Sequence, residues 1–167
     1  GNDRTSYVNH LTAVGSPTAA GADGPFGKGT LLNGTSQYGH TSVNMPTAVP
    51  LQLMAYVKFS NVAGAYSMMD YHSTTDTNTR VLGYSNGPLW NAFAQVGAAG
   101  SQATALGNVA SGTWTSLSAL FGSAVNRVAK RDSGNLGTNN TSVVTAWSAI
   151  AAQLFVGAGR PGNGAGT

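Results

Sequence analysis

The acidic residues bear first on whether this chain could cleave a glycosidic bond. All five acidic residues are aspartates and none is a glutamate: Asp3, Asp23, Asp70, Asp76 and Asp132. Glycosidases use two carboxyl groups a few ångströms apart, one as the acid and the other as the nucleophile or base. The aspartates are far apart in the sequence and form no alternating group on a strand. We therefore expect no glycosidase.

A serine between glycines raises the question of a second kind of hydrolase, one with a serine nucleophile. Gly83-Tyr84-Ser85-Asn86-Gly87 matches the Gly-x-Ser-x-Gly nucleophile elbow, and Asp70 and His72 could complete a triad. That elbow needs a strand before the serine and a helix after it. Pro88-Leu89-Trp90 instead continues as a strand. The pattern therefore favours a hairpin, and we expect the chain not to be an enzyme.

The elements that position these residues are strands, because hydrophobic and polar residues alternate along most of the chain. The clearest strand is 51–59, with Leu51, Leu53, Ala55, Val57 and Phe59 on one face and Gln52, Met54, Tyr56 and Lys58 on the other. Further strands are predicted at 29–32, 37–43, 65–71, 80–84, 89–96, 113–121, 124–131, 143–147 and 153–156. The segment 96–107 is either a loop or a strand of small residues.

Turn residues between these strands complete the fold prediction. Asn33-Gly34 and Asn86-Gly87 are both favoured pairs for tight hairpins, and Pro88 cannot donate to a strand ladder. Strands at intervals of about ten residues with turn chemistry between them are typical of sandwiches and jelly rolls. We predict one all-β domain over 1–167, a two-sheet antiparallel jelly-roll sandwich.

Composition limits the partners. Charged residues make up only 8% of the chain and hydrophobic residues 41%, with a net charge of +3. Of the basic residues only Arg127, Lys130 and Arg131 lie close together, whereas nucleic-acid binders show a dense basic patch interleaved with aromatics. The longest apolar run, 149–159, is too short and glycine-rich to span a bilayer. We expect neither nucleic acid nor a membrane span.

Several short motifs follow one another along the chain: Asn9-His10-Leu11-Thr12, Leu32-Asn33-Gly34-Thr35-Ser36-Gln37-Tyr38, Ala55-Tyr56-Val57-Lys58, Gly112-Thr113-Trp114 and Val156-Gly157-Ala158-Gly159-Arg160. Their order resembles that of the laminin-G-like domains of the concanavalin A-like lectin–glucanase superfamily, of bacterial or phage type. The resemblance implies a concanavalin-like sandwich and a glycan-binding, adhesive or virion protein. The family normally has a strand before the first motif and a long closing strand after the last. We expect a longer chain or a neighbouring subunit to supply these strands.

The sequence also contains residues that could bind a metal ion. Asp76-Thr77-Asn78 begins like a calcium loop, but the required glycine and final glutamate are absent. A calcium ion held by Asp76 and Asn78, with Asp70 and Asp23 as further ligands, stays an alternative to a chain without cofactors. The histidines His10, His40 and His72 lack zinc-site spacing, and the chain has no cysteine.

A glycan site needs exposed aromatic faces with amide and hydroxyl partners. The sequence places such residues near two adjacent strand ends: Tyr71, His72, Tyr84, Asn86, Trp90 and Asn91. We predict glycan contact there; the alternative is that Trp90 and Trp114 belong to the core.

The functional prediction is a non-catalytic module. The low charge and the Thr-, Ser-, Asn- and Ala-rich composition favour a subunit of a virion or similar assembly, such as a phage capsid decoration, fibre or tail protein. Its partners would be other structural subunits, it would be oligomeric, and it would lie on a virion surface or outside the cell. The alternative is a free-standing lectin-like module of a secreted bacterial protein. The sequence leaves the ligand, the host and the oligomeric state open.

Overall fold

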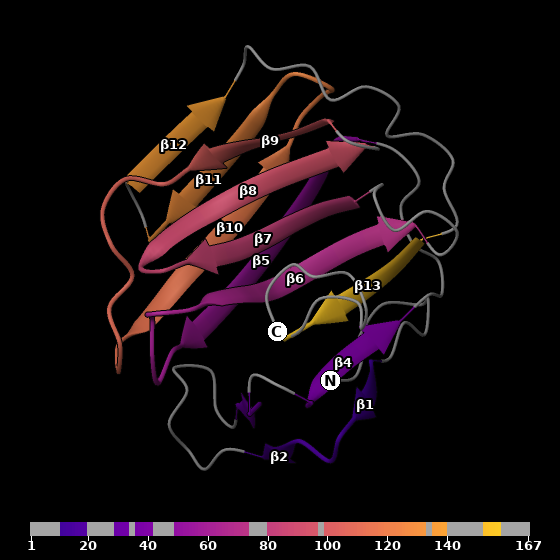
Figure 1. The fold of residues 1–167 in the computed structure, drawn as a ribbon, viewed down its shortest axis with the longest axis vertical. Coiled ribbons are helices and arrows are strands. Elements are labelled where there is room, and N and C mark those ends of the chain that lie inside the picture. The colour runs from indigo at the N-terminus through magenta and orange to yellow at the C-terminus, as the bar shows by residue number, and fades with distance from the viewer. Residues whose placement is uncertain are drawn as a thin grey trace.

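Two antiparallel sheets packed face to face form the body of the protein (Figure 1). This computed structural model describes residues 11–19, 29–33, 36–41, 49–73, 80–96, 99–132, 135–139 and 152–157. All the described strand pairings are antiparallel. The predicted all-β, two-sheet antiparallel sandwich is therefore confirmed.

The larger sheet has seven strands. Their spatial order is β1 (Thr12–Val14), β4 (Tyr38–Thr41), β13 (Ala152–Val156), β6 (Ala65–Ser73), β7 (Arg80–Asn86), β8 (Leu89–Val96) and β9 (Ala99–Thr104). The smaller sheet has four strands, in the order β12 (Asn135–Asn139), β11 (Arg127–Arg131), β10 (Trp114–Phe121) and β5 (Leu51–Lys58). A separate short ribbon pairs β2 (Thr18–Ala19) with β3 (Thr30–Leu31).

The core lies between β7 and β8 of one sheet and β5, β10 and β11 of the other. Trp90 on β8 is completely buried there, together with Leu117, Ala119 and Phe121 on β10. On the neighbouring strand β7, Gly83 is diagonal to Trp90, and a Cβ added at Gly83 would lie 2.6 Å from the Trp90 ring. A glycine is required at this point because the indole fills the space that a side chain would occupy.

Strand β5 shows why the sequence alternates where it does. Leu53 is buried in the core, and Leu51, Ala55 and Val57 pack against it from the same face. Gln52, Met54, Tyr56 and Lys58 point to the other side and are exposed. The predicted strand and both of its faces are confirmed, and the polar face of β5 forms part of the outer surface of the four-stranded sheet.

One predicted hairpin forms with a shifted turn. Asn86 pairs with Leu89, so the two-residue loop between β7 and β8 is Gly87-Pro88 and not Asn86-Gly87. Gly87 has a φ of 57°, the positive value that a tight hairpin turn needs at its first central residue. The expected hairpin is therefore present, one residue further along the chain.

The hairpin predicted at Asn33-Gly34 is wrong. Strand β3 pairs with β2, whereas β4 pairs with β1 and β13, so the segment joins two different sheets. The Asn33 side-chain oxygen instead accepts hydrogen bonds from the backbone N–H groups of Ser36 (2.9 Å) and Gln37 (3.0 Å). This is the local bonding that asparagine offers a loop in place of a ladder.

The remaining strand predictions have three outcomes. The small-residue segment does contain a strand, β9, which forms an edge of the larger sheet. Strands β1, β2 and β12 were not predicted, because each is short and lacks a hydrophobic alternation. The predicted strand 143–147 lies outside the described residues. Within the part of the chain that the structure describes, no helix has the length and hydropathy to cross a bilayer.

Candidate functional site

The outer face of the four-stranded sheet carries a group of exposed apolar side chains. Met54 and Tyr56 on β5 are 64% and 40% exposed, and Lys58 follows them on the same face. Trp114, at the start of β10, pairs directly with Lys58 and is partly exposed. We call Met54, Tyr56, Lys58 and Trp114 the aromatic platform.

The two rings of the aromatic platform are held by sheet register. Ser116 is opposite Tyr56, so Tyr56 and Trp114 are diagonal neighbours on adjacent antiparallel strands. Aromatic side chains reach each other across that diagonal. The ring centroids are 5.3 Å apart at an interplanar angle of 15°, which is a stacked arrangement. Stacking fixes the orientation of the exposed Tyr56 ring without closing it off from solvent.

Lys58 completes the aromatic platform. Its Nζ lies 5.7 Å from the centroid of the Trp114 ring, within the range of a cation–π contact. The contact restrains the lysine side chain beside the rings. It leaves the positive charge of Lys58 uncompensated, because the Trp114 ring carries a quadrupole but no net charge. The aromatic platform therefore combines a fixed ring surface, a flexible thioether and one cation.

The polar groups beside the aromatic platform belong to the ends of β10 and β11. The Asp132 carboxylate accepts a hydrogen bond from the Ser116 backbone N–H at 3.1 Å. It also pairs with the Arg131 guanidinium at 3.3 Å. Asp132 itself has a φ of 52°, which turns its side chain back onto the neighbouring strand. This carboxylate thus has a structural role at the end of β11.

Three of the predicted glycan-site residues are buried. Trp90 lies in the core and donates its indole N–H to the carbonyl oxygen of Ser118 at 2.8 Å. Tyr71 is 1% exposed, and burial raises its pKa to about 12 from 10.0. Asn91 is equally buried and accepts a hydrogen bond from the Thr104 hydroxyl at 2.7 Å. In this structure the three side chains contact protein and not solvent.

The register also separates the six predicted residues into two groups. Asn86 pairs with Ala65 at one end of β6, whereas Tyr71 and His72 lie near the other end. Six residues of strand put these groups about 20 Å apart. Tyr84 and Asn91 pair with each other near the hairpin, and Asn86 is exposed there.

The side chains of His72 and Tyr84 and all of Asp76 and Asn78 lie outside the described part of the chain. Ligand contact by these residues stays a prediction.

The serine of the elbow pattern lies on strand β7, with its side chain in the core. Ser85 is fully buried and pairs with Trp90. Asp70 pairs with Leu82 and Phe155, which places it on the opposite face of the same sheet. Among the described residues, no group of three or more His, Cys, Asp or Glu side chains could hold a metal ion.

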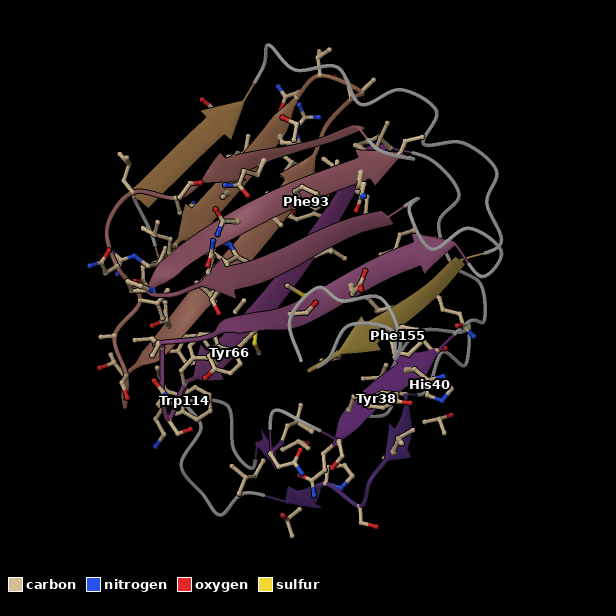
Figure 2. The ribbon with its side chains drawn as sticks, viewed as in Figure 1. Tyr38, His40, Tyr66, Phe93, Trp114 and Phe155 are labelled. Carbon is tan, nitrogen blue, oxygen red and sulfur yellow. The ribbon has the colours of Figure 1, made fainter. Side chains whose placement is uncertain are left out.

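A second aromatic cluster lies on the outer face of the seven-stranded sheet. His40 is stacked on Phe155 with centroids 5.7 Å apart, and Tyr38 lies 5.6 Å from the same ring. Figure 2 shows this cluster well away from Trp114. Phe155 is only 6% exposed, so its ring serves mainly to pack the two half-buried neighbours. The aromatic platform therefore presents the better contact surface.

The sequence predicts which strand face carries Met54, Tyr56 and Lys58, but it does not predict that they lie beside Trp114. The alternation of β5 puts Met54, Tyr56 and Lys58 on the polar face, as observed. The alternative that both Trp90 and Trp114 belong to the core holds for Trp90 only, because the Trp114 side chain is partly exposed on the outer face of the smaller sheet. The available signal was the alternation of β10, in which Leu117, Ala119 and Phe121 take the opposite face from Trp114.

The fold and this surface define a class, an antiparallel β-sandwich with an exposed aromatic surface on one sheet. No family model and no curated protein matches this chain. Among solved structures, the carbohydrate-binding module CBM66 from Bacillus subtilis has a similar fold. The match has a TM-score of 0.50 and 15% identity, and covers 90% of this chain and 91% of that one. At this identity the likeness shows the fold, so the resemblance drawn from the sequence is confirmed as a β-sandwich and no family is assigned.

Proposed function

We propose that this chain is a non-catalytic glycan-binding module whose contact surface is the aromatic platform. The observation that carries the proposal is the exposed Tyr56 ring stacked on Trp114. A sugar ring has an apolar C–H face that packs on an aromatic face and hydroxyls that need polar partners. The Tyr56 hydroxyl, the Lys58 ammonium and the Ser116 hydroxyl border the rings and can meet these hydroxyls.

The fold supports the same function. The solved structure with a similar fold is a carbohydrate-binding module, which is a non-catalytic kind of domain. On this chain the two described carboxylates, Asp70 and Asp132, lie on different sheets, and Asp132 is engaged with Ser116 and Arg131. This arrangement supports a binding role in place of bond cleavage. An extracellular location belongs to the proposal, because glycan-binding modules act on glycans outside the cell.

Of the two functions that the sequence suggests, the free-standing glycan-binding module has the better support. The virion role was inferred from composition and from the resemblance alone. The exposed Tyr56–Trp114 ring pair favours glycan binding and gives no specific support to a virion role. We therefore propose the glycan-binding module, which the sequence analysis gave as the alternative.

The test is a binding assay against a panel of soluble neutral and acidic polysaccharides by affinity gel electrophoresis. We expect retardation by at least one polysaccharide, and about tenfold weaker binding for Tyr56→Ala and for Trp114→Ala, because each substitution removes a ring worth roughly 1.4 kcal/mol. Tyr56→Phe keeps the ring and should retain most of the affinity.

The matched control is Leu106→Ala. Leu106 is 65% exposed and lies in the loop after β9, outside the aromatic platform. This substitution also removes an exposed apolar side chain, so it should leave retardation unchanged. If no polysaccharide in the panel retards the protein, or if Tyr56→Ala and Leu106→Ala behave alike, the proposed function is wrong.

A further inference from the structure

The charges around the aromatic platform are mostly positive. Lys58 is part of it, and Lys130 on β11 faces the same side, because Lys130 pairs with Ser118 and Ser118 pairs with Met54. Cross-strand partners share one face of a sheet. Two strands across and four residues along, the Cα atoms of Lys58 and Lys130 are about 17 Å apart. The two cations thus flank the ring pair across the sheet.

The described carboxylate at the end of β11, that of Asp132, does not neutralise these lysines. Asp132 is bound to the Ser116 N–H and to the Arg131 guanidinium, so its charge is already compensated. Within the described part of the chain, neither Lys58 nor Lys130 forms an ion pair. The face therefore presents two uncompensated ammonium groups beside an apolar ring surface.

This combination matches one kind of glycan. We propose that the ligand of the aromatic platform is an acidic polysaccharide whose sugars carry carboxylates, that is, a uronic acid polymer. The inference rests on the proposed function and names its ligand class. A uronic acid ring packs its C–H face on Tyr56 while its carboxylate meets the Lys58 ammonium. Lys130 meets the carboxylate of a sugar further along the chain.

A carboxylated polymer fits better than a sulfated one. Two lysines about 17 Å apart supply one cation for every few sugars, and a lysine acts as a single point charge. Heavily sulfated chains carry more negative charge and are attracted to dense basic clusters. The described face has no such cluster, since Arg127 is buried at the far end of β11.

The experiment compares two forms of one polymer by isothermal titration calorimetry. Polygalacturonate carries the carboxylates, and its fully methyl-esterified form has the same rings without the charge. We expect about fivefold tighter binding of the acid form at low salt, with the preference falling as salt rises, because exposed ion pairs are individually weak and are screened. Lys58→Gln should remove most of the preference, whereas Lys58→Arg should keep it.

The outcomes separate the two proposals. Equal binding of acid and ester, unchanged in Lys58→Gln but lost in Tyr56→Ala, overturns the acidic ligand and leaves the proposed function intact. Failure of both polymers and of every panel polysaccharide to bind overturns both proposals. Tighter binding of dextran sulfate than of polygalacturonate overturns the carboxylate assignment. Preference for the acid form that depends on both Lys58 and Tyr56 supports the inference.

Discussion

The indole N–H of Trp90 donates a hydrogen bond to the carbonyl oxygen of Ser118, 2.8 Å away in the opposite sheet. Trp90 is completely buried, so the bond crosses the core between β8 and β10. A buried carbonyl that loses its donor costs free energy, and the indole is also the largest side chain in the core. The bond therefore links the larger sheet to the strand that carries Trp114.

Trp90→Phe should lower stability without changing glycan affinity. The substitution removes the hydrogen bond to Ser118 and leaves a cavity, and we expect the free energy of unfolding to fall by about 2–3 kcal/mol in urea titrations. The dissociation constant, measured under conditions where the variant is folded, should be unchanged. A selective loss of affinity at full stability would instead place Trp90 in the binding site.

Gly83→Ala should destabilise the same part of the core. The added Cβ would lie 2.6 Å from the Trp90 ring, and the buried indole has no room to retreat. We expect a loss of about 1–3 kcal/mol in the free energy of unfolding, measured by chemical denaturation. Gly122→Ala is the matched control, because its nearest neighbour is the flexible Asn126 side chain at 3.4 Å. Equal effects at the two positions would contradict the packing described for Trp90.

Stability should fall in alkali because of Tyr71. Burial raises the pKa of this tyrosine to about 12, whereas its unfolded value is 10.0. Above pH 10 the unfolded chain releases this proton and the folded chain keeps it, so the folded state becomes relatively less stable until the pH passes the folded pKa. From pH 9 to pH 11 the contribution amounts to about 1 kcal/mol. Below about pH 9 both states are protonated, and Tyr71 adds no pH dependence.

The measurement is urea unfolding of wild type and Tyr71→Phe across this range. The wild-type protein should lose more stability than the variant between pH 9 and pH 11, because phenylalanine has no proton to release. Parallel loss in the two proteins would show that Tyr71 titrates alike in the folded and unfolded states.

The residue ranges of the long strands and their buried faces could be predicted from the sequence, for a physical reason. Strands β5 and β10 bury one face only, so burial imposes a strict alternation of side chains that the sequence displays. Strand β1 has three residues and is mostly exposed, and neither β1 nor β12 shows a hydrophobic alternation that would mark it in the sequence. The order of strands within each sheet was also beyond local patterns, as the misassigned Asn33-Gly34 hairpin shows.

The candidate site was harder to predict than the fold for a similar reason. Alternation assigns a residue to a face, but it does not say which sheet covers that face. Trp90 and Trp114 both lie within the first two residues of a strand, yet Trp90 is in the core and Trp114 faces outward. Only the register of β5 against β10 brings Tyr56 next to Trp114.

The most direct test of the glycan-binding proposal follows the indole N–H signals in a ¹H–¹⁵N spectrum during titration with polygalacturonate. The chain has three tryptophans, and Trp114→Phe and Trp90→Phe identify two of the signals. We predict a saturable shift of the Trp114 signal, with the Trp90 signal unmoved because Trp90 is buried. Binding that leaves the Trp114 signal in place, or no shift with this or any other polysaccharide of the panel, would contradict the account.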